Sequence, residues 1–136
     1  MSDNNKKPEI AQNNEQAFVD GSKYEGEFVN GKKDGKGTYT WGKHSQFPGY
    51  KYTGDWKEDR KEGKGIYYYP SGEIQYEGDF LNDQFEGTGK FYYEDKSCYE
   101  GQWKNYLAEG NGVCYYPDGN RYEGQFSKGK RGVERW

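Results

Sequence analysis

The stretch YEGDF at Tyr76–Phe80 decides the fold, because this 136-residue chain contains five versions of it. The other versions are YEGEF (Tyr24–Phe28), YTGDW (Tyr52–Trp56), YEGQW (Tyr99–Trp103) and YEGQF (Tyr122–Phe126). Their first tyrosines are 28, 24, 23 and 23 residues apart. Such a period over most of a chain is typical of a repeat array, in which each unit contacts mainly its neighbours. An array presents a long surface rather than a deep cleft, so the pattern favours binding over catalysis.

A Gly-x-Gly pair marks the second half of each of the first four units. The pairs are Gly35/Gly37, Gly63/Gly65, Gly87/Gly89 and Gly110/Gly112. An aromatic-rich segment such as Ile66–Tyr69 follows each pair, and turn formers such as Pro70–Gly72 close the unit. The period-two alternation predicts strands, and the short connections predict antiparallel pairing. We therefore expect an all-β domain over residues 18–136, preceded by a flexible polar tail over 1–17, with weak helix over Glu9–Ala17 as the alternative for that segment.

Composition limits the class of protein. Aromatic residues make up 19% of the chain and 21 residues are glycine, a balance that favours β-structure with large rings as the buried surface. The net charge of −3 argues against nucleic acid as a partner. Two cysteines, Cys98 and Cys114, are too few for a disulfide framework or a zinc site. With no signal peptide and no apolar run near the roughly 20 residues of a membrane span, we expect an intracellular protein.

Size matching between strands suggests a register for each hairpin. If Phe28 lies opposite Gly37, then Gly26 faces Tyr39, and each ring covers a glycine on the opposite strand. In the fourth unit the same rule places Cys114 opposite a glycine. The smaller side chain would leave a shallow dent in the surface.

The tyrosine block, followed by a glycine pair with a period of about 23 residues, resembles the MORN (membrane occupation and recognition nexus) repeat over residues 18–132. The resemblance implies an elongated single-layer antiparallel sheet of tandem β-hairpins. It also implies a non-enzymatic scaffold or adaptor, a structural subunit of a cytoskeletal assembly, and in the first place of a radial-spoke-like assembly in a cilium or flagellum axoneme. The alternatives are a tether to phosphoinositides or other anionic membrane lipids, and a regulatory subunit that binds an enzyme.

Alternation along the strands places the aromatic residues on one face, with glycines as low points between them. A single sheet leaves this face uncovered, and large exposed apolar patches usually mark an interaction site. The predicted partner is a protein, bound as an amphipathic helix or extended peptide or as a neighbouring subunit of a large assembly. The residues of this predicted trough are Tyr24, Phe28, Tyr39, Trp41, Tyr52, Trp56, Gly65, Tyr67, Tyr76, Phe80, Gly89, Phe91, Tyr99, Trp103, Tyr122 and Phe126.

Charged residues predict weaker functions. Basic residues gather before the glycine pairs and predict a salt-sensitive contact with anionic lipid through Lys32, Lys33, Lys57, Arg60, Lys61 and Lys64. The carboxylates of the face opposite the rings, such as Glu27 and Asp55, recur on an open surface. We interpret them as a solvated face that attracts a basic partner rather than as catalytic pairs. No catalytic, cofactor-binding or metal-binding residue is predicted.

Overall fold

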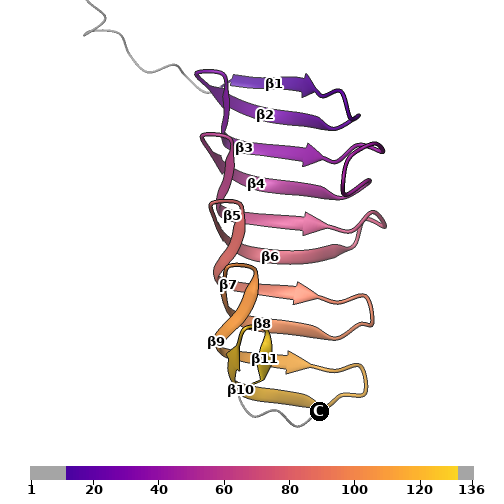
Figure 1. Ribbon diagram of the computed structural model, residues 1–136, viewed down its shortest axis with the longest axis vertical. Helices are drawn as coiled ribbons and strands as arrows, with labels where there is room; N and C mark the ends of the chain where they lie inside the picture. Colours follow the sequence, from indigo (N-terminus) through magenta and orange to yellow (C-terminus); the bar gives the residue numbers. More distant parts are fainter. Residues whose placement is uncertain (1–11, 132–136) are drawn as a thin grey trace, which may run out of the picture.

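A computed structural model describes residues 12–131 as one eleven-stranded antiparallel sheet. Strand order follows chain order, so the strands form successive rungs of a single layer (Figure 1). The strands are β1 (Gln12–Ala17), β2 (Lys23–Val29), β3 (Lys32–Thr40), β4 (Lys51–Lys57), β5 (Arg60–Tyr68), β6 (Ile74–Leu81), β7 (Gln84–Tyr92), β8 (Cys98–Lys104), β9 (Leu107–Tyr115), β10 (Arg121–Ser127) and β11 (Lys130–Arg131). This architecture confirms the predicted elongated sheet of tandem hairpins. Among the residues described, no helix is long and apolar enough to cross a membrane.

The first strand corrects the predicted start of the domain. Residues 12–17 were expected to be tail or weak helix, but they form β1, whose Asn14 and Gln16 pair with Gly26 and Tyr24 of β2. The side chains at 14–17 are all exposed, so no hydrophobic pattern indicates this strand. The backbone groups along the edge of β2 recruit it, because each N–H and C=O needs a partner. The remainder of the predicted tail, residues 1–11, lies outside the described residues.

Two-residue turns fix the register of the β2–β3, β4–β5, β6–β7, β8–β9 and β10–β11 hairpins. Both residues of each turn have positive φ, as type I′ turns require: Asn30-Gly31, Glu58-Asp59, Asn82-Asp83, Asn105-Tyr106 and Lys128-Gly129. Tyr24 consequently pairs with Tyr39, and Gly26 pairs with Gly37. The predicted pairing of Phe28 with glycine is wrong, since Phe28 pairs with Lys33 beyond a β-bulge. Likewise, Cys114 pairs with Tyr99 and Tyr122 rather than with a glycine.

A continuous row of glycines crosses the sheet from β2 to β10. Its members pair in succession as Gly26, Gly37, Gly54, Gly65, Gly78, Gly89, Gly101, Gly112 and Gly124. The row leaves room for the motif tyrosines to lie against the backbone. An added Cβ at Gly65 would approach Cε1 and Oη of Tyr52 to 2.3 Å. The Tyr52 hydroxyl then donates a hydrogen bond to the carbonyl of Asp55 on its own strand (2.8 Å), which fixes the ring in this position.

The acidic residue at the fourth position of the motif supports the bulge beside it. Asp55 Oδ2 accepts a hydrogen bond from the backbone N–H of Lys64 (3.0 Å), and its other oxygen pairs with the ammonium of Lys36. Asp79 repeats the arrangement, with the N–H of Thr88 (3.0 Å) and the ammonium of Lys64 (2.5 Å). These carboxylates were predicted to form a solvated face that attracts a basic partner. In the structure they hold the bulges and connect one hairpin to the next.

We expect acid unfolding to follow these two carboxylates. Partial burial works against ionisation of Asp55 and Asp79, but the hydrogen bonds from lysine and backbone N–H groups lower the pKa of both. A pKa that is lower in the folded state gives stabilisation that is complete above the unfolded value of about 3.9 and is lost as pH falls through the folded value. The urea midpoint of unfolding should therefore fall steeply below about pH 4.

Two variants test this origin of the pH dependence. Asp79→Asn should show a smaller fall in the urea midpoint below about pH 4 than the wild type. Glu94→Gln, at an exposed loop position, should keep the wild-type slope. Identical slopes in both variants would show that the bulge carboxylates are not responsible.

Candidate functional site

The tips of the hairpins fold over one face of the sheet and bury most of its rings. Figure 1 shows the tips turning away from the direction of the rungs along one side. Phe85, which lies just after the β6–β7 turn, stacks on Tyr76 with ring centroids 3.8 Å apart and planes at 8°. The four motif tyrosines Tyr24, Tyr52, Tyr76 and Tyr99 are 0–1% exposed, and Trp56, Phe80, Trp103 and Phe126 are 3–6% exposed. These eight residues were predicted to line an open trough, and the structure places them in the interior instead.

The glycine floor of the predicted trough is also closed. Gly65 and Gly89 are buried beneath the rings of Tyr52 and Tyr76. Filling these positions would displace the tyrosines rather than fill a surface hollow. These glycines therefore stabilise the fold by making room for the tyrosine rings, and they do not contact a partner directly.

An open groove of about 450 Å³ remains beside the central hairpins. Its lining residues are Trp41, Phe47, Tyr50, Lys61, Tyr67, Gln75, Phe85, Phe91 and Tyr106, and we call it the aromatic groove. Trp41, Tyr67 and Phe91 belong to the predicted trough, and the structure brings these half-buried rings together here. The other half-buried residues of the predicted trough flank the interior nearer the ends of the sheet: Phe28, Tyr39 and Tyr122.

The remaining aromatic residues of the groove were missed because they lie in segments that read as polar loops. Phe47 and Tyr50 come from the connection between β3 and β4, with ring centroids 6.2 Å apart. Tyr106 belongs to the β8–β9 turn, and its ring lies 4.9 Å from that of Phe85. The available signal was a bulky ring where the other units carry polar or small residues. Such a ring lines the groove only because the hairpin tips fold back over the sheet, and the alternation of residues along the strands does not predict this folding.

One position of each hairpin tip lies over the interior rings. This lid position, as we call it, is the second residue after the two-residue turn and pairs with the last aromatic residue of the motif. In the first four hairpins it is occupied by Lys33, Lys61, Phe85 and Ala108. The lid therefore changes along the sheet from two cations to two apolar residues.

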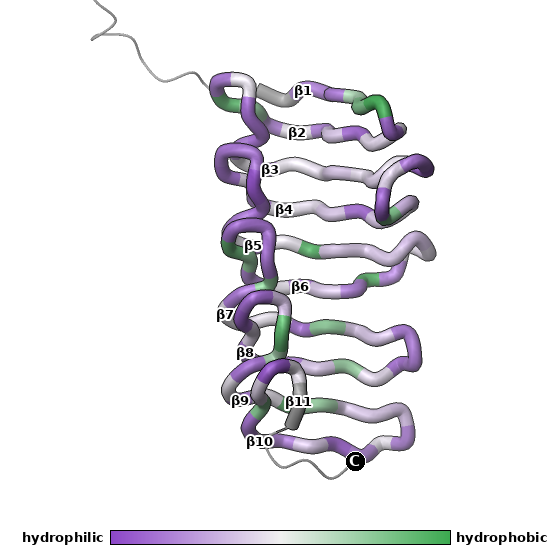
Figure 2. Tube along the Cα trace, viewed as in Figure 1, coloured by the Kyte–Doolittle hydropathy of each residue, from purple (hydrophilic) through white to green (hydrophobic). Residues whose placement is uncertain are grey.

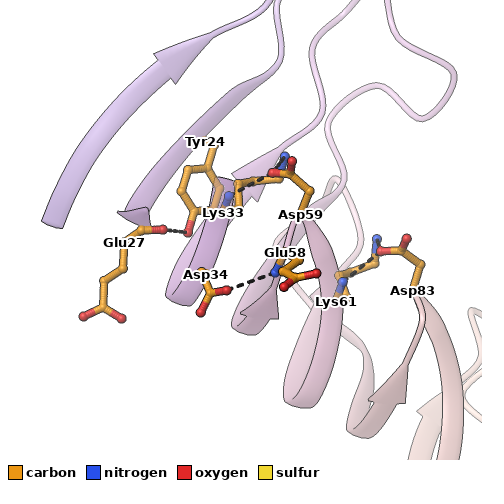
Figure 3. A network of polar contacts seen from close by, with 8 residues as sticks. All are labelled: Tyr24, Glu27, Lys33, Asp34, Glu58, Asp59, Lys61 and Asp83. Carbon is orange, nitrogen blue, oxygen red and sulfur yellow. Dashed lines mark hydrogen bonds and ion pairs between the residues drawn. The ribbon is translucent and has the colours of Figure 1, made fainter. Parts of the chain in front are cut away.

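Lys61 is buried among rings. Its Nζ lies 5.5 Å from the ring centroid of Trp41 and 5.6 Å from that of Tyr67, distances at which ring faces attract a cation. Asp83 of the next tip lies 3.3 Å from the ammonium through Oδ1, and the same oxygen accepts the backbone N–H of Lys61 (2.8 Å; Figure 3). Burial lowers the pKa of Lys61, while Asp83 partly offsets the effect.

Lys33 repeats this arrangement one hairpin earlier. Its Nζ lies 5.3 Å from the ring centroid of Trp56 and 5.7 Å from that of Tyr24. Asp59 Oδ1 accepts the backbone N–H of Lys33 at 2.8 Å and pairs with its ammonium at 3.3 Å (Figure 3). Asp59 and Asp83 thus tie each of these tips to the one before it, and Asp34 adds a bond by accepting the backbone N–H of Glu58 (3.1 Å; Figure 3).

These contacts reduce the number of basic residues that remain available at the predicted lipid-binding edge. The ammonium groups of Lys33 and Lys61 lie over the rings and cannot also form an outward edge. Lys64 is held by Asp79 on a neighbouring strand. Lys64 nevertheless remains exposed, as do Lys32, Lys57 and Arg60 of that predicted set. Figure 2 shows mostly hydrophilic residues at the tips of these hairpins. In the sequence, acidic residues such as Asp34, Glu58 and Asp59 lie among the basic ones.

The opposite face of the sheet carries tyrosines engaged with charged residues. Lys51 Nζ lies 4.6 Å from the ring centroid of Tyr68, and Lys90 Nζ lies 5.1 Å from that of Tyr92. The Tyr92 hydroxyl donates a hydrogen bond to Glu77 Oε1 (2.8 Å). Over the part of the chain that the structure covers, no group of three or more His, Cys, Asp or Glu side chains is arranged to hold a metal ion.

Comparison with known proteins agrees with the repeat architecture. The MORN repeat model matches residues 24–46, 52–74, 76–98, 99–121 and 122–136. Each match begins at a motif tyrosine and runs through the hairpin that follows it. A search of curated proteins found no match to this chain. With five consecutive matches over most of its length, the chain belongs to the MORN repeat family.

Proposed function

We propose that this chain is a non-enzymatic scaffold that holds a segment of a partner protein in the aromatic groove. The observation that carries the proposal is the meeting of half-buried Trp41, Tyr67 and Phe91 in one open groove on a continuous sheet. Concave sites lined by aromatic side chains with a few polar groups are typical of binding sites. Neighbouring rings already hold these side chains in place, so binding costs little side-chain entropy. Membership of the MORN family supports a scaffold or interaction role.

For the partner, we propose a component of a cytoskeletal assembly, and in the first place a ciliary or axonemal one. This choice rests on the resemblance to MORN proteins alone. An enzyme regulated through the same groove would fit the same surface, and identification of the bound segment decides between the two. The tether to anionic membranes has less support, because Lys33 and Lys61 face rings and Lys64 is paired with Asp79.

Site-specific crosslinking tests the groove. Benzoylphenylalanine placed at Tyr106, 42% exposed at the border of the groove, should crosslink few proteins in extracts of the native cell. Mass spectrometry should map each crosslink to one segment of the partner. The matched control is Tyr115, which is 36% exposed and follows the core-facing Cys114, so it points to the opposite face. Equal yields from the two positions, or a yield from Tyr115 alone, would contradict the proposal.

A further inference from the structure

The aromatic groove has a charged end and an apolar end. Lys61 lines it on the side of β4 and β5, where the preceding lid residue, Lys33, is also a cation. Phe85, Phe91 and Tyr106 line it on the side of β7 to β9. A segment bound along the groove therefore meets a different chemistry at each end.

The ammonium of Lys61 lies on the inner side of its ion pair. The Lys61 side chain is 10% exposed, whereas that of Asp83 is 45% exposed. Asp83 is also fixed by the backbone N–H of Lys61, so its carboxylate stays at the rim. An ammonium group carries three N–H donors. Among the residues that line the groove, the ammonium of Lys61 lies over the rings of Trp41 and Tyr67. An anionic group that enters the groove can share this cation with Asp83.

The fold does not require a cation at the lid position. Phe85 and Ala108 occupy the same position in the next two hairpins and keep the same pairing with the sheet. Burying a lysine is costly, and the lowered pKa of Lys61 reflects this cost. The Lys61–Asp83 pair ties two tips together, and the same lysine lines the groove, where its ammonium can also contact a bound segment.

We propose that the aromatic groove selects a peptide segment that places one carboxylate side chain at Lys61 and apolar side chains over Phe85, Phe91 and Tyr106. This inference rests on the proposed function, because it takes the groove to hold a protein segment. Charge complementarity supplies the choice of occupant: the groove offers a desolvated cation at one end and rings at the other. Inside the groove a basic side chain would face the like charge of Lys61 and is disfavoured there, and the carboxylate with which it would pair, that of Asp83, lies at the rim.

Selection from a random 12-residue peptide library displayed on phage tests the inference. The library is selected on the wild type, on Lys61→Met, on Lys57→Met as the control for an exposed lysine outside the groove, and on Trp41→Ala, which opens the groove. Peptides from the wild type and Lys57→Met should carry Asp or Glu beside apolar residues, and synthetic versions with Gln should bind about tenfold more weakly. On Lys61→Met the selected peptides should remain apolar and lose the acidic residue.

The outcomes separate this inference from the proposed function. A library that is enriched no more on the wild type than on Trp41→Ala would overturn the proposed function. Enrichment of apolar peptides without an acidic residue, or an acidic preference that persists in Lys61→Met, would overturn the inference and leave the groove intact. Lys61-dependent binding of phosphatidylserine vesicles with no acidic peptide selected would assign the cation to lipid and also overturn it. A melting temperature of Lys61→Met at or above that of the wild type shows that the variant is folded, and Lys61→Gln replaces it otherwise.

Discussion

Gly65→Ala should destabilise the protein by about 3 kcal/mol, although it adds a single methyl group. The added Cβ would lie 2.3 Å from both Cε1 and Oη of Tyr52, a ring that is fully buried. The ring cannot move aside, because its hydroxyl is bonded to the carbonyl of Asp55 and Trp56 packs edge-on against it with centroids 5.2 Å apart. Urea denaturation followed by tryptophan fluorescence measures the loss.

A second glycine provides the matched control. Gly72 has φ +96° and nothing within 4 Å of an added Cβ, so Gly72→Ala pays only for the left-handed backbone, about 1–2 kcal/mol. The comparison separates the steric role of the glycine row from the conformational role of a turn glycine. Equal losses at the two positions would show that the tyrosine does not depend on the bare backbone beneath it.

The strands and their order could be predicted from the sequence because the motif encodes them locally. Alternation in Tyr76–Phe80 and its four equivalents indicates a strand, and short connections leave only antiparallel neighbours. The register could not be predicted by matching large with small residues. It is set by the turns, and only Asn30-Gly31 carries the usual type I′ sequence, whereas Glu58-Asp59 and Asn105-Tyr106 adopt the same positive φ without it.

The composition of the aromatic face could also be predicted, but its accessibility could not. Trp41, Tyr67 and Phe91 were placed correctly on one face because alternation fixes the side of the sheet. Whether a ring on that face is open depends on the bulge and on the bend of each tip, which are tertiary features. Lys61 illustrates the difficulty: a lysine in a polar segment reads as solvated, and only the folded tip shows that it lies over Trp41.

Strand β1 was missed for a different reason. Its side chains bury nothing at positions 14–17, so it contributes through backbone hydrogen bonds to β2. A polar segment beside an open sheet edge carries no periodic signal of its own. Strand β1 therefore forms because the edge of β2 offers backbone partners, and the composition of residues 12–17 does not indicate it.

Trp103→Ala should cost about 4 kcal/mol, a large part of the stability of a domain of this size. Trp103 is 6% exposed and packs against Tyr76, Phe85 and Tyr99, with centroid distances of 5.0–5.5 Å. Its Nε1 donates a hydrogen bond to the carbonyl of Gly89 (2.9 Å), so truncation leaves both a cavity and an unpaired acceptor. A lowered urea midpoint with an unchanged slope measures the loss.

Trp41→Ala is the matched control, because Trp41 has the same side chain but is only half-buried, in the aromatic groove. Its removal should cost only about 1 kcal/mol while reducing the crosslinking yield from Tyr106. The two tryptophans therefore separate stability from binding: one belongs to the interior that the tips close, and the other to the surface that the tips leave open. Equal losses of stability in the two variants, or a loss below about 1 kcal/mol for Trp103→Ala, would mean that the tips do not seal the interior and that the distinction between core and groove is wrong.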